Sequence, residues 1–139
     1  MVALANRSTV AQTAQQLGAA CDVPVDYLSK VLNCLCKANL VKAQRGRGGG
    51  FLLAALPSQT TVLEVVNAVD PVRRIKQCPL GLAAHGTTLC PLHRKLDDAA
   101  RSLEEAFTVL TLSSLVPEAP LSTPFCEGGK NCDAAVGSR

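Results

Sequence analysis

The chain has 139 residues, of which 47% are apolar and 18% are charged. This length fits one compact domain with at most one appendage, because two independent cores would each bury too little apolar surface. No run of about 18 uncharged apolar residues is present, and no charged segment precedes an apolar one at the start, so neither a membrane span nor a signal peptide is expected. We therefore expect a cytoplasmic protein, in which the seven cysteines favour metal ligands, reactive thiols or core packing over disulfides.

The net charge of +3 is distributed unevenly along the chain. Residues 1–56 carry six basic and two acidic side chains, whereas residues 57–116 carry six of each and residues 117–139 carry two basic and three acidic ones. A basic region beside a neutral remainder is typical of a protein that binds a polyanion with one part of its surface.

Residues 13–37 predict two short helices joined by a tight turn. Thr13 is a suitable N-cap for a helix ending near Cys21, and residues 22–25 form the turn. From Pro24 onward, apolar residues recur at a 3.6-residue period, so the second helix has one buried and one polar face. This pair fits a helix-turn-helix, although an ordinary amphipathic helix pair has the same pattern. The polar face consists of Asp26, Ser29, Lys30, Asn33 and Lys37.

Residues 40–55 predict a β-hairpin. Two strand-like runs, 40–44 and 51–55, flank the sequence Arg45-Gly46-Arg47-Gly48-Gly49-Gly50. A nucleotide-binding loop is disfavoured, because no Gly-Lys-Ser/Thr follows and the next segment is strand-like rather than helical. The hairpin therefore reads as a wing with Arg45 and Arg47 at its tip, where they can contact phosphates or a minor groove.

The rest of the chain divides into four segments. A capping box at Thr61 begins a short helix that ends before Pro71, and residues 71–91 read as a loop. A long helix follows within residues 92–116, with its charged residues mostly on the other side from an apolar stripe that packs either on a second subunit or on the chain's own core. Residues 117–139 are expected to be a disordered tail. The stripe comprises Leu92, Leu96, Ala99, Leu103, Ala106 and Leu110.

Four blocks of residues 1–116 resemble one family: the winged-helix regulators of the iron–sulfur-cluster repressor and nitric-oxide-sensitive repressor type (IscR/NsrR, the Rrf-two family). The blocks are residues 27–32 (Tyr-Leu-Ser-Lys-Val-Leu), the wing at 45–53, the loop from Cys78 to His93, and residues 111–115 (Thr-Leu-Ser-Ser-Leu). The Arg-Gly-x-Gly-Gly-Gly wing is the most specific. Family members usually begin with a full amphipathic helix, of which residues 1–5 match only the end, so an apolar face is expected to be uncovered.

The resemblance implies a mainly α fold with a small β-wing: a winged helix-turn-helix at residues 1–70, a cluster or sensor loop at 71–91, and a dimerisation helix at 92–116. It implies a homodimer that binds double-stranded operator DNA and usually represses transcription. It also implies that a metal cluster senses redox, nitric oxide or iron–sulfur status. The DNA-contacting residues would be Asp26, Ser29, Lys30, Asn33, Arg45 and Arg47, since such polar groups can reach base edges and phosphates.

The loop departs from the family pattern of three cysteines at x5 spacing. Cys78, Cys90 and His93 fall in register, but the middle position is Ala84, followed by His85. Two thiols and two imidazoles suit a [2Fe–2S] cluster or tetrahedral zinc. The alternative is a loop without metal, in which the two cysteines are a redox pair. The more distant Cys126 and Cys132 are not expected to be ligands.

Nothing in the sequence predicts an enzyme. No nucleophile has a base at a defined spacing, and no nucleotide-binding loop is present. The alternative function is a winged-helix adaptor that binds proteins and carries a structural zinc or thiol loop.

Overall fold

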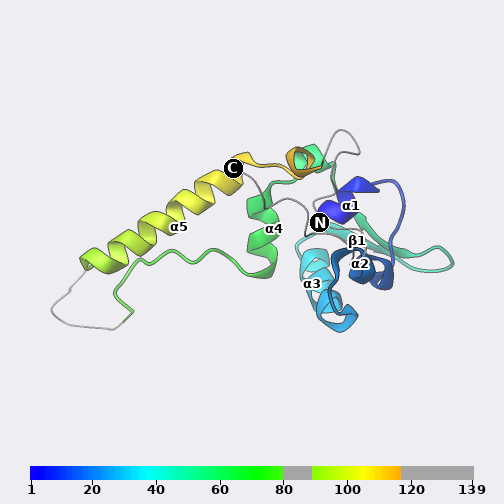
Figure 1. Ribbon diagram of the computed structural model, residues 1–139, viewed down its shortest axis with the longest axis horizontal. Helices are drawn as coiled ribbons and strands as arrows, with labels where there is room; N and C mark the ends of the chain where they lie inside the picture. Colours follow the sequence, from blue (N-terminus) through cyan, green and yellow to red (C-terminus); the bar gives the residue numbers. More distant parts are fainter. Residues whose placement is uncertain (80–88, 117–139) are drawn as a thin grey trace, which may run out of the picture.

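The computed structural model describes residues 1–79 and 89–116. Figure 1 shows an elongated molecule, with a group of short helices and a hairpin at one end and a long helix extending to the other. Within these residues the fold is mainly helical with one two-stranded antiparallel sheet, as the sequence predicts. The α-helices and strands are α1 (Val2–Asn6), α2 (Ala14–Cys21), α3 (Val25–Lys37), β1 (Val41–Gln44), β2 (Gly50–Leu53), α4 (Val62–Val69) and α5 (Pro91–Val109).

Local hydrogen bonds fix where two of the helices begin. The Thr13 side chain accepts from the backbone N–H of Gln16, whose side chain accepts from the Thr13 N–H at 2.8 Å. Thr61 and Glu64 form the same reciprocal pair at the start of α4, and these bonds hold the pKa of the Glu64 carboxyl below its usual value. Both boxes satisfy backbone donors that the first helical turn leaves without partners.

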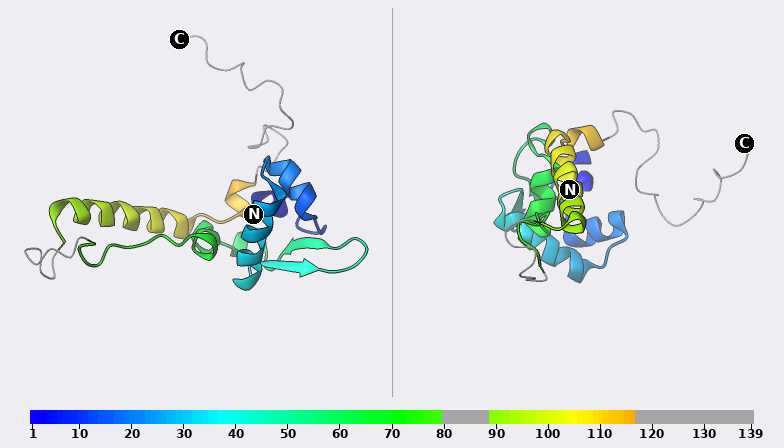
Figure 2. Two further views of the ribbon diagram at one scale, coloured as in Figure 1. Left: turned by 90° about the horizontal axis from the view of Figure 1, so that it is seen from below. Right: turned by 90° about the vertical axis from the view of Figure 1, so that its left-hand side faces the viewer.

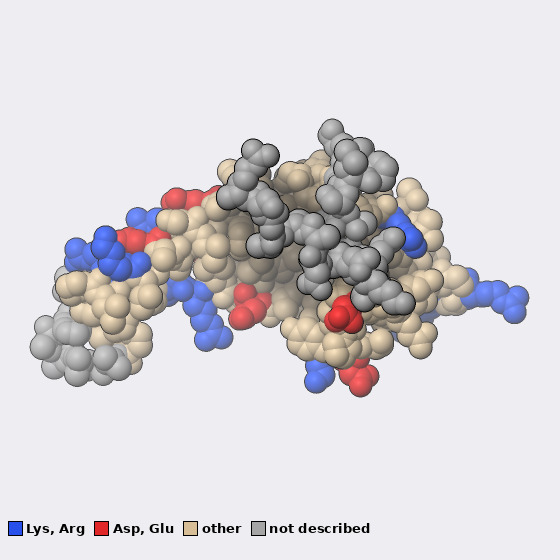
Figure 3. Space-filling model, in the orientation of Figure 1, with Lys and Arg blue, Asp and Glu red and all other residues tan. Residues whose placement is uncertain are grey.

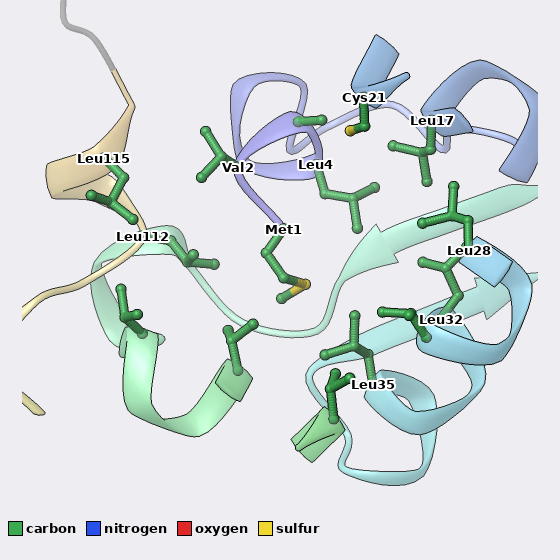
Figure 4. Close-up of a pocket in the computed structure, with 15 residues that line it drawn as sticks. Met1, Val2, Leu4, Leu17, Cys21, Leu28, Leu32, Leu35, Leu112 and Leu115 are labelled. Atoms are coloured by element: carbon green, nitrogen blue, oxygen red, sulfur yellow. The ribbon is translucent and has the colours of Figure 1, made fainter. Parts of the chain in front are cut away.

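An aliphatic core joins α1, α2, α3 and the wing. Its buried members are Leu4, Leu17, Leu32, Leu35 and Val41, each at most 3% exposed. Beside it lies an apolar hollow of about 310 Å³, lined by side chains of α1 to α4 and by Leu112 and Leu115 (Figure 4). This hollow lies against the short α1, where the sequence predicts an uncovered apolar face.

A third chain segment pairs with the wing beside the turn of the hairpin. Strands β1 and β2 pair from Val41↔Leu53 to Gln44↔Gly50, and Gln12 forms a β-bridge with Phe51 through bonds of 2.8 and 3.0 Å. A Cβ at Gly50 would lie 2.6 Å from the Gln12 backbone. The bridge therefore requires glycine at this end of the predicted glycine-rich turn.

The long helix is shorter than the predicted segment 92–116, because it ends at Val109. Its C-terminal end turns back onto the winged-helix part: the Leu110 carbonyl accepts from the Val62 N–H at 2.8 Å, and the Leu112 N–H donates to Thr60 at 2.9 Å. A 3-10 turn, η3 (Ser113–Leu115), follows. Leu112 is 2% exposed, so its burial favours the turn over continued helix.

The segment after α4, residues 71–79, is named the arm. It runs beside α5 in the opposite direction (Figure 2). The sequence places Asp97 with the charged residues away from the apolar stripe, on a face expected to be solvated. The structure instead buries Asp97 at 9% exposure against the arm, where it forms an ion pair with Arg74 at 2.6 Å. The position of an acidic residue along a helix does not indicate whether a basic residue from a distant segment will cover it.

Some predictions fall outside the described residues, namely those on Ala84, His85, Cys126, Cys132 and the segment 117–139. Within residues 1–79 and 89–116, no helix is both long enough and apolar enough to cross a bilayer.

Candidate nucleic-acid interface and thiol cluster

The polar face of α3 is the first candidate for DNA contact. Asp26, Lys30 and Asn33 are exposed. Ser29 is half-buried, and its hydroxyl donates to the Val25 carbonyl at 2.8 Å. Its hydrogen is therefore engaged within the helix, and Ser29 offers only acceptor lone pairs to a ligand.

Tyr27 is a further exposed side chain of α3, and the sequence did not lead us to expect that it contacts DNA. It is 61% exposed and lies three residues before Lys30, a spacing that places two side chains together on a helix surface. Its ring can pack on a thymine methyl group or a sugar, and its hydroxyl can bond a phosphate. The sequence signal that could have identified Tyr27 is its position directly before Leu28, outside the apolar period that forms the buried face of α3.

The tip of the wing is the second candidate. Arg45 and Arg47 are both exposed, and Figure 3 shows basic side chains projecting at the end of the molecule where the hairpin ends. Gly48 has a φ of +81°, a left-handed conformation that side chains rarely adopt. The turn therefore holds its two arginines on a narrow loop that can approach a polyanion closely.

A separate candidate site, for metal binding or thiol chemistry, is a cluster of two thiols and an imidazole beside the start of α5. Cys90 is the N-cap of this helix, and its Sγ lies 3.2 Å from Nδ1 of His93. The Sγ of Cys78, from the arm, lies 3.7 Å from the same nitrogen. The structure thus brings together three of the four predicted loop residues, while His85 lies outside the described residues. We call Cys78, Cys90 and His93 the thiol–imidazole cluster.

The separations in this cluster are compatible with shared ligands of one metal. Two tetrahedral ligands at zinc–sulfur and zinc–nitrogen bond lengths stand about 3.5 Å apart, between the two observed distances. Among the described residues, however, no group of three or more His, Cys, Asp or Glu side chains is placed so that it could hold a metal ion. The donor types suit a soft metal or cluster, but binding one would require a further ligand and a closer arrangement of these side chains.

The apolar stripe of α5 faces away from the chain's own core. Leu92, Leu96 and Leu103 are 65%, 49% and 42% exposed, and both alanines of the stripe are exposed too. The opposite face carries Asp97 and contacts the arm. The described part of the chain's own core therefore does not cover this stripe.

The chain matches one family model over residues 1–118, described as Rrf2, "Iron-dependent Transcriptional regulator". It is similar to the HTH-type transcriptional regulator IscR of Klebsiella pneumoniae, with 32% identity over 68% of this chain and 58% of that protein. It is also 27% identical to IscR of Aliivibrio salmonicida over 82% of this chain and 67% of that protein. The chain spans about two thirds or less of the length of these relatives.

Solved structures share the fold. The IscR of T. potens superposes with a TM-score of 0.69 at 20% identity, covering 88% of this chain and 83% of that one. CymR, described as the global cysteine regulator of B. subtilis, superposes with a TM-score of 0.66 at 19% identity, covering 82% of this chain and 84% of that one. The winged-helix arrangement and the aliphatic core agree with the family match, which covers residues 1–118. The chain therefore belongs to the Rrf2 family of winged-helix transcriptional regulators.

Proposed function

We propose that this protein binds operator DNA as a homodimer and represses transcription. The loop between the arm and α5 would sense redox, nitric oxide or iron–sulfur status and so regulate DNA binding. The observation that carries the proposal is the separation of two sites along one elongated molecule. Exposed polar and basic groups lie on α3 and the wing, and the thiol–imidazole cluster lies at the far end of α5.

The DNA site would consist of the exposed face of α3 and the wing tip. Lys30 and Asn33 can enter a major groove from the helix, while Arg45 and Arg47 contact phosphates or the adjacent minor groove. The basic excess of residues 1–56 supports this assignment, because phosphate neutralisation supplies much of the affinity for duplex DNA. Asp26 and Ser29 complete the proposed set, Ser29 as an acceptor.

The exposed stripe of α5 supports the dimer. A row of leucines and alanines on a long helix packs well against its counterpart in a second subunit, and symmetric operators need two readers at a fixed spacing. Pairing along α5 would also place the two thiol–imidazole clusters next to the dimer interface. A change in either loop could then alter the spacing of the two winged helices.

Cys78, Cys90 and His93, together with His85, would hold the metal or cluster. A [2Fe–2S] centre would supply one-electron redox chemistry and reactivity with nitric oxide, whereas zinc would supply a stable structural site. The mixed donor set supports both. The imidazole between the two thiols also suits a metal-free thiol pair, which is the third outcome to be tested.

DNA binding is tested with duplexes selected from random sequence. We expect nanomolar-range binding to a palindromic site that weakens steeply with added salt. Specific binding to a protein partner without salt-dependent DNA binding would instead favour the adaptor function. Equal affinity for all duplexes would contradict sequence-specific regulation.

The sensor is tested on protein purified without oxygen. Visible absorption with bound iron supports a cluster, and colourless protein with stoichiometric zinc supports a structural site. Cys78→Ala and Cys90→Ala should each abolish metal retention, and His85→Ala should do so if His85 replaces the missing middle cysteine. Operator affinity that is equal with and without metal would contradict sensing, and metal-free protein that binds its operator would contradict both metal assignments.

A further inference from the structure

We propose that the contact between Arg74 and Asp97 positions Cys78 against Cys90 and His93, and so completes the thiol–imidazole cluster. This inference rests on the proposed role of the cluster as a ligand or redox site, and it identifies the residues that set the geometry of that site. We call Arg74, Ile75 and Asp97 the clasp.

The three members of the cluster reach it in different ways. Cys90 and His93 are three residues apart at the start of α5, so the helix itself holds them together at 3.2 Å. Cys78 belongs to the arm, which has neither helical nor strand structure over residues 71–78. Its approach to His93 therefore depends on whatever fixes the arm to α5.

The clasp fixes both a side chain and the backbone of the arm. Asp97 Oδ1 accepts from Arg74 Nε at 2.7 Å and from the backbone N–H of Ile75 at 2.9 Å, and Oδ2 accepts from Arg74 Nη2 at 2.6 Å. Two parallel bonds from a planar guanidinium define direction as well as distance. The Asp97 side chain is only 13% exposed, so water competes weakly for these bonds.

The register of the clasp carries Cys78 to the cluster. His93 lies four residues before Asp97, one turn earlier on the same face of α5. Cys78 lies four residues after Arg74 on an arm that runs in the opposite direction (Figure 2). Holding Arg74 at Asp97 therefore brings the end of the arm to the start of the helix.

A second acidic residue extends the clasp along α5. Glu104 Oε2 accepts from Arg74 Nη1 at 3.3 Å, two turns beyond Asp97. The two carboxylates raise the pKa of the Arg74 guanidinium, and this guanidinium lowers the pKa of Asp97 to about 2. Both partners are thus charged at neutral pH, as the geometry requires.

The first measurement uses full-length, metal-free, reduced protein. A cross-linker with two thiol-reactive groups and a one-carbon spacer is added, and the Cys78–Cys90 product is followed by peptide mass spectrometry. The wild type should form this product readily, whereas Arg74→Ala and Asp97→Asn should form it about tenfold more slowly. Arg101→Ala is the matched control: Arg101 also lies near Asp97, at 3.8 Å, but is 54% exposed, and its loss should change the rate less than twofold.

The second measurement is cobalt(II) titration of the same proteins. Loss of a partner that orients ligands typically weakens metal binding tenfold to a hundredfold, and we expect this range for Arg74→Ala. The sulfur-to-cobalt charge-transfer band should also fall to the level of one thiolate, matching Cys78→Ala. Arg74→Lys, which keeps the charge but loses the planar fork, should recover part of both signals.

These outcomes separate the clasp from the proposed sensor. A wild type that binds no cobalt contradicts the metal site, and the cross-linking rates then decide the clasp alone. Should Arg74→Ala lose its helical circular dichroism, the isosteric Asp97→Asn and the conservative Arg74→Lys carry the test. Wild-type cross-linking and cobalt binding in Asp97→Asn, or the absence of a Cys78–Cys90 product in the wild type, would overturn the inference.

Discussion

In the winged-helix part, the side chains that join α1, α2, α3 and β1 are aliphatic and almost fully buried. In the arm and α5, the joining groups are a guanidinium and two carboxylates, and leucines of the same helix remain exposed. The first region buries its own apolar surface, and the second holds an extended shape by directional polar contacts. This difference supports the proposal that α5 pairs with a second subunit, because its leucines have no partner in the described core.

The largest expected effect is on the aliphatic core. Leu32→Ala should lower the free energy of unfolding by about 2–5 kcal/mol, because a fully buried leucine leaves a cavity. Urea unfolding at low protein concentration measures it. Leu103→Ala is the comparison: at the same concentration it should change unfolding by less than about 0.5 kcal/mol, and an equal loss would show that α5 also packs in the monomer.

The next effect concerns assembly. Leu103→Glu should give a folded monomer whose affinity for a palindromic operator is reduced about a hundredfold, equivalent to about 2.8 kcal/mol, because each half-site then binds separately. Sedimentation and DNA titration measure this. Glu105→Gln, which changes an exposed charge on the same helix, is the control, and a dimeric Leu103→Glu protein would place the interface elsewhere.

A smaller effect is the acid sensitivity of the clasp. The pKa of Asp97 is lowered to about 2 by its bonds to Arg74, so the folded state is stabilised above the ordinary aspartate pKa of 3.8. This stabilisation is lost as the pH falls through the folded value. The urea midpoint should therefore fall more between about pH 5 and about pH 2.5 in the wild type than in Asp97→Asn. Equal falls in both proteins would mean that the ion pair does not stabilise the arm.

The smallest effect is on the salt dependence of DNA binding. Arg47→Ala should weaken binding to every duplex and reduce the salt slope by about one unit, as expected for one lost phosphate contact. Lys95→Ala, which removes an exposed charge from α5, should leave the slope unchanged. An unchanged slope with altered base preference in Arg47→Ala would instead assign this arginine to base or groove-shape recognition.

Features governed by neighbours in the chain could be predicted from the sequence. The caps at Thr13 and Thr61 depend on residues three positions away, and the buried stripe of α3 follows from its period. The hairpin follows from two β-prone runs around glycines. The convergence of Cys78, Cys90 and His93 was predicted from register with a family pattern, although the metal-binding role of these residues remains a prediction.

Features that join distant segments were decided only by the tertiary structure. Arg74 and Asp97 are 23 residues apart, and each alone is a charged residue of the kind that normally faces solvent. The bridge between Gln12 and Phe51 and the hydrogen bond between Val62 and Leu110 also join distant segments. Nothing in the sequence of either segment indicates its partner. Local sequence determines which backbone groups need partners, whereas the identity of a distant partner depends on how the helices pack, because a carboxylate has the same chemistry on a solvated and on a covered face.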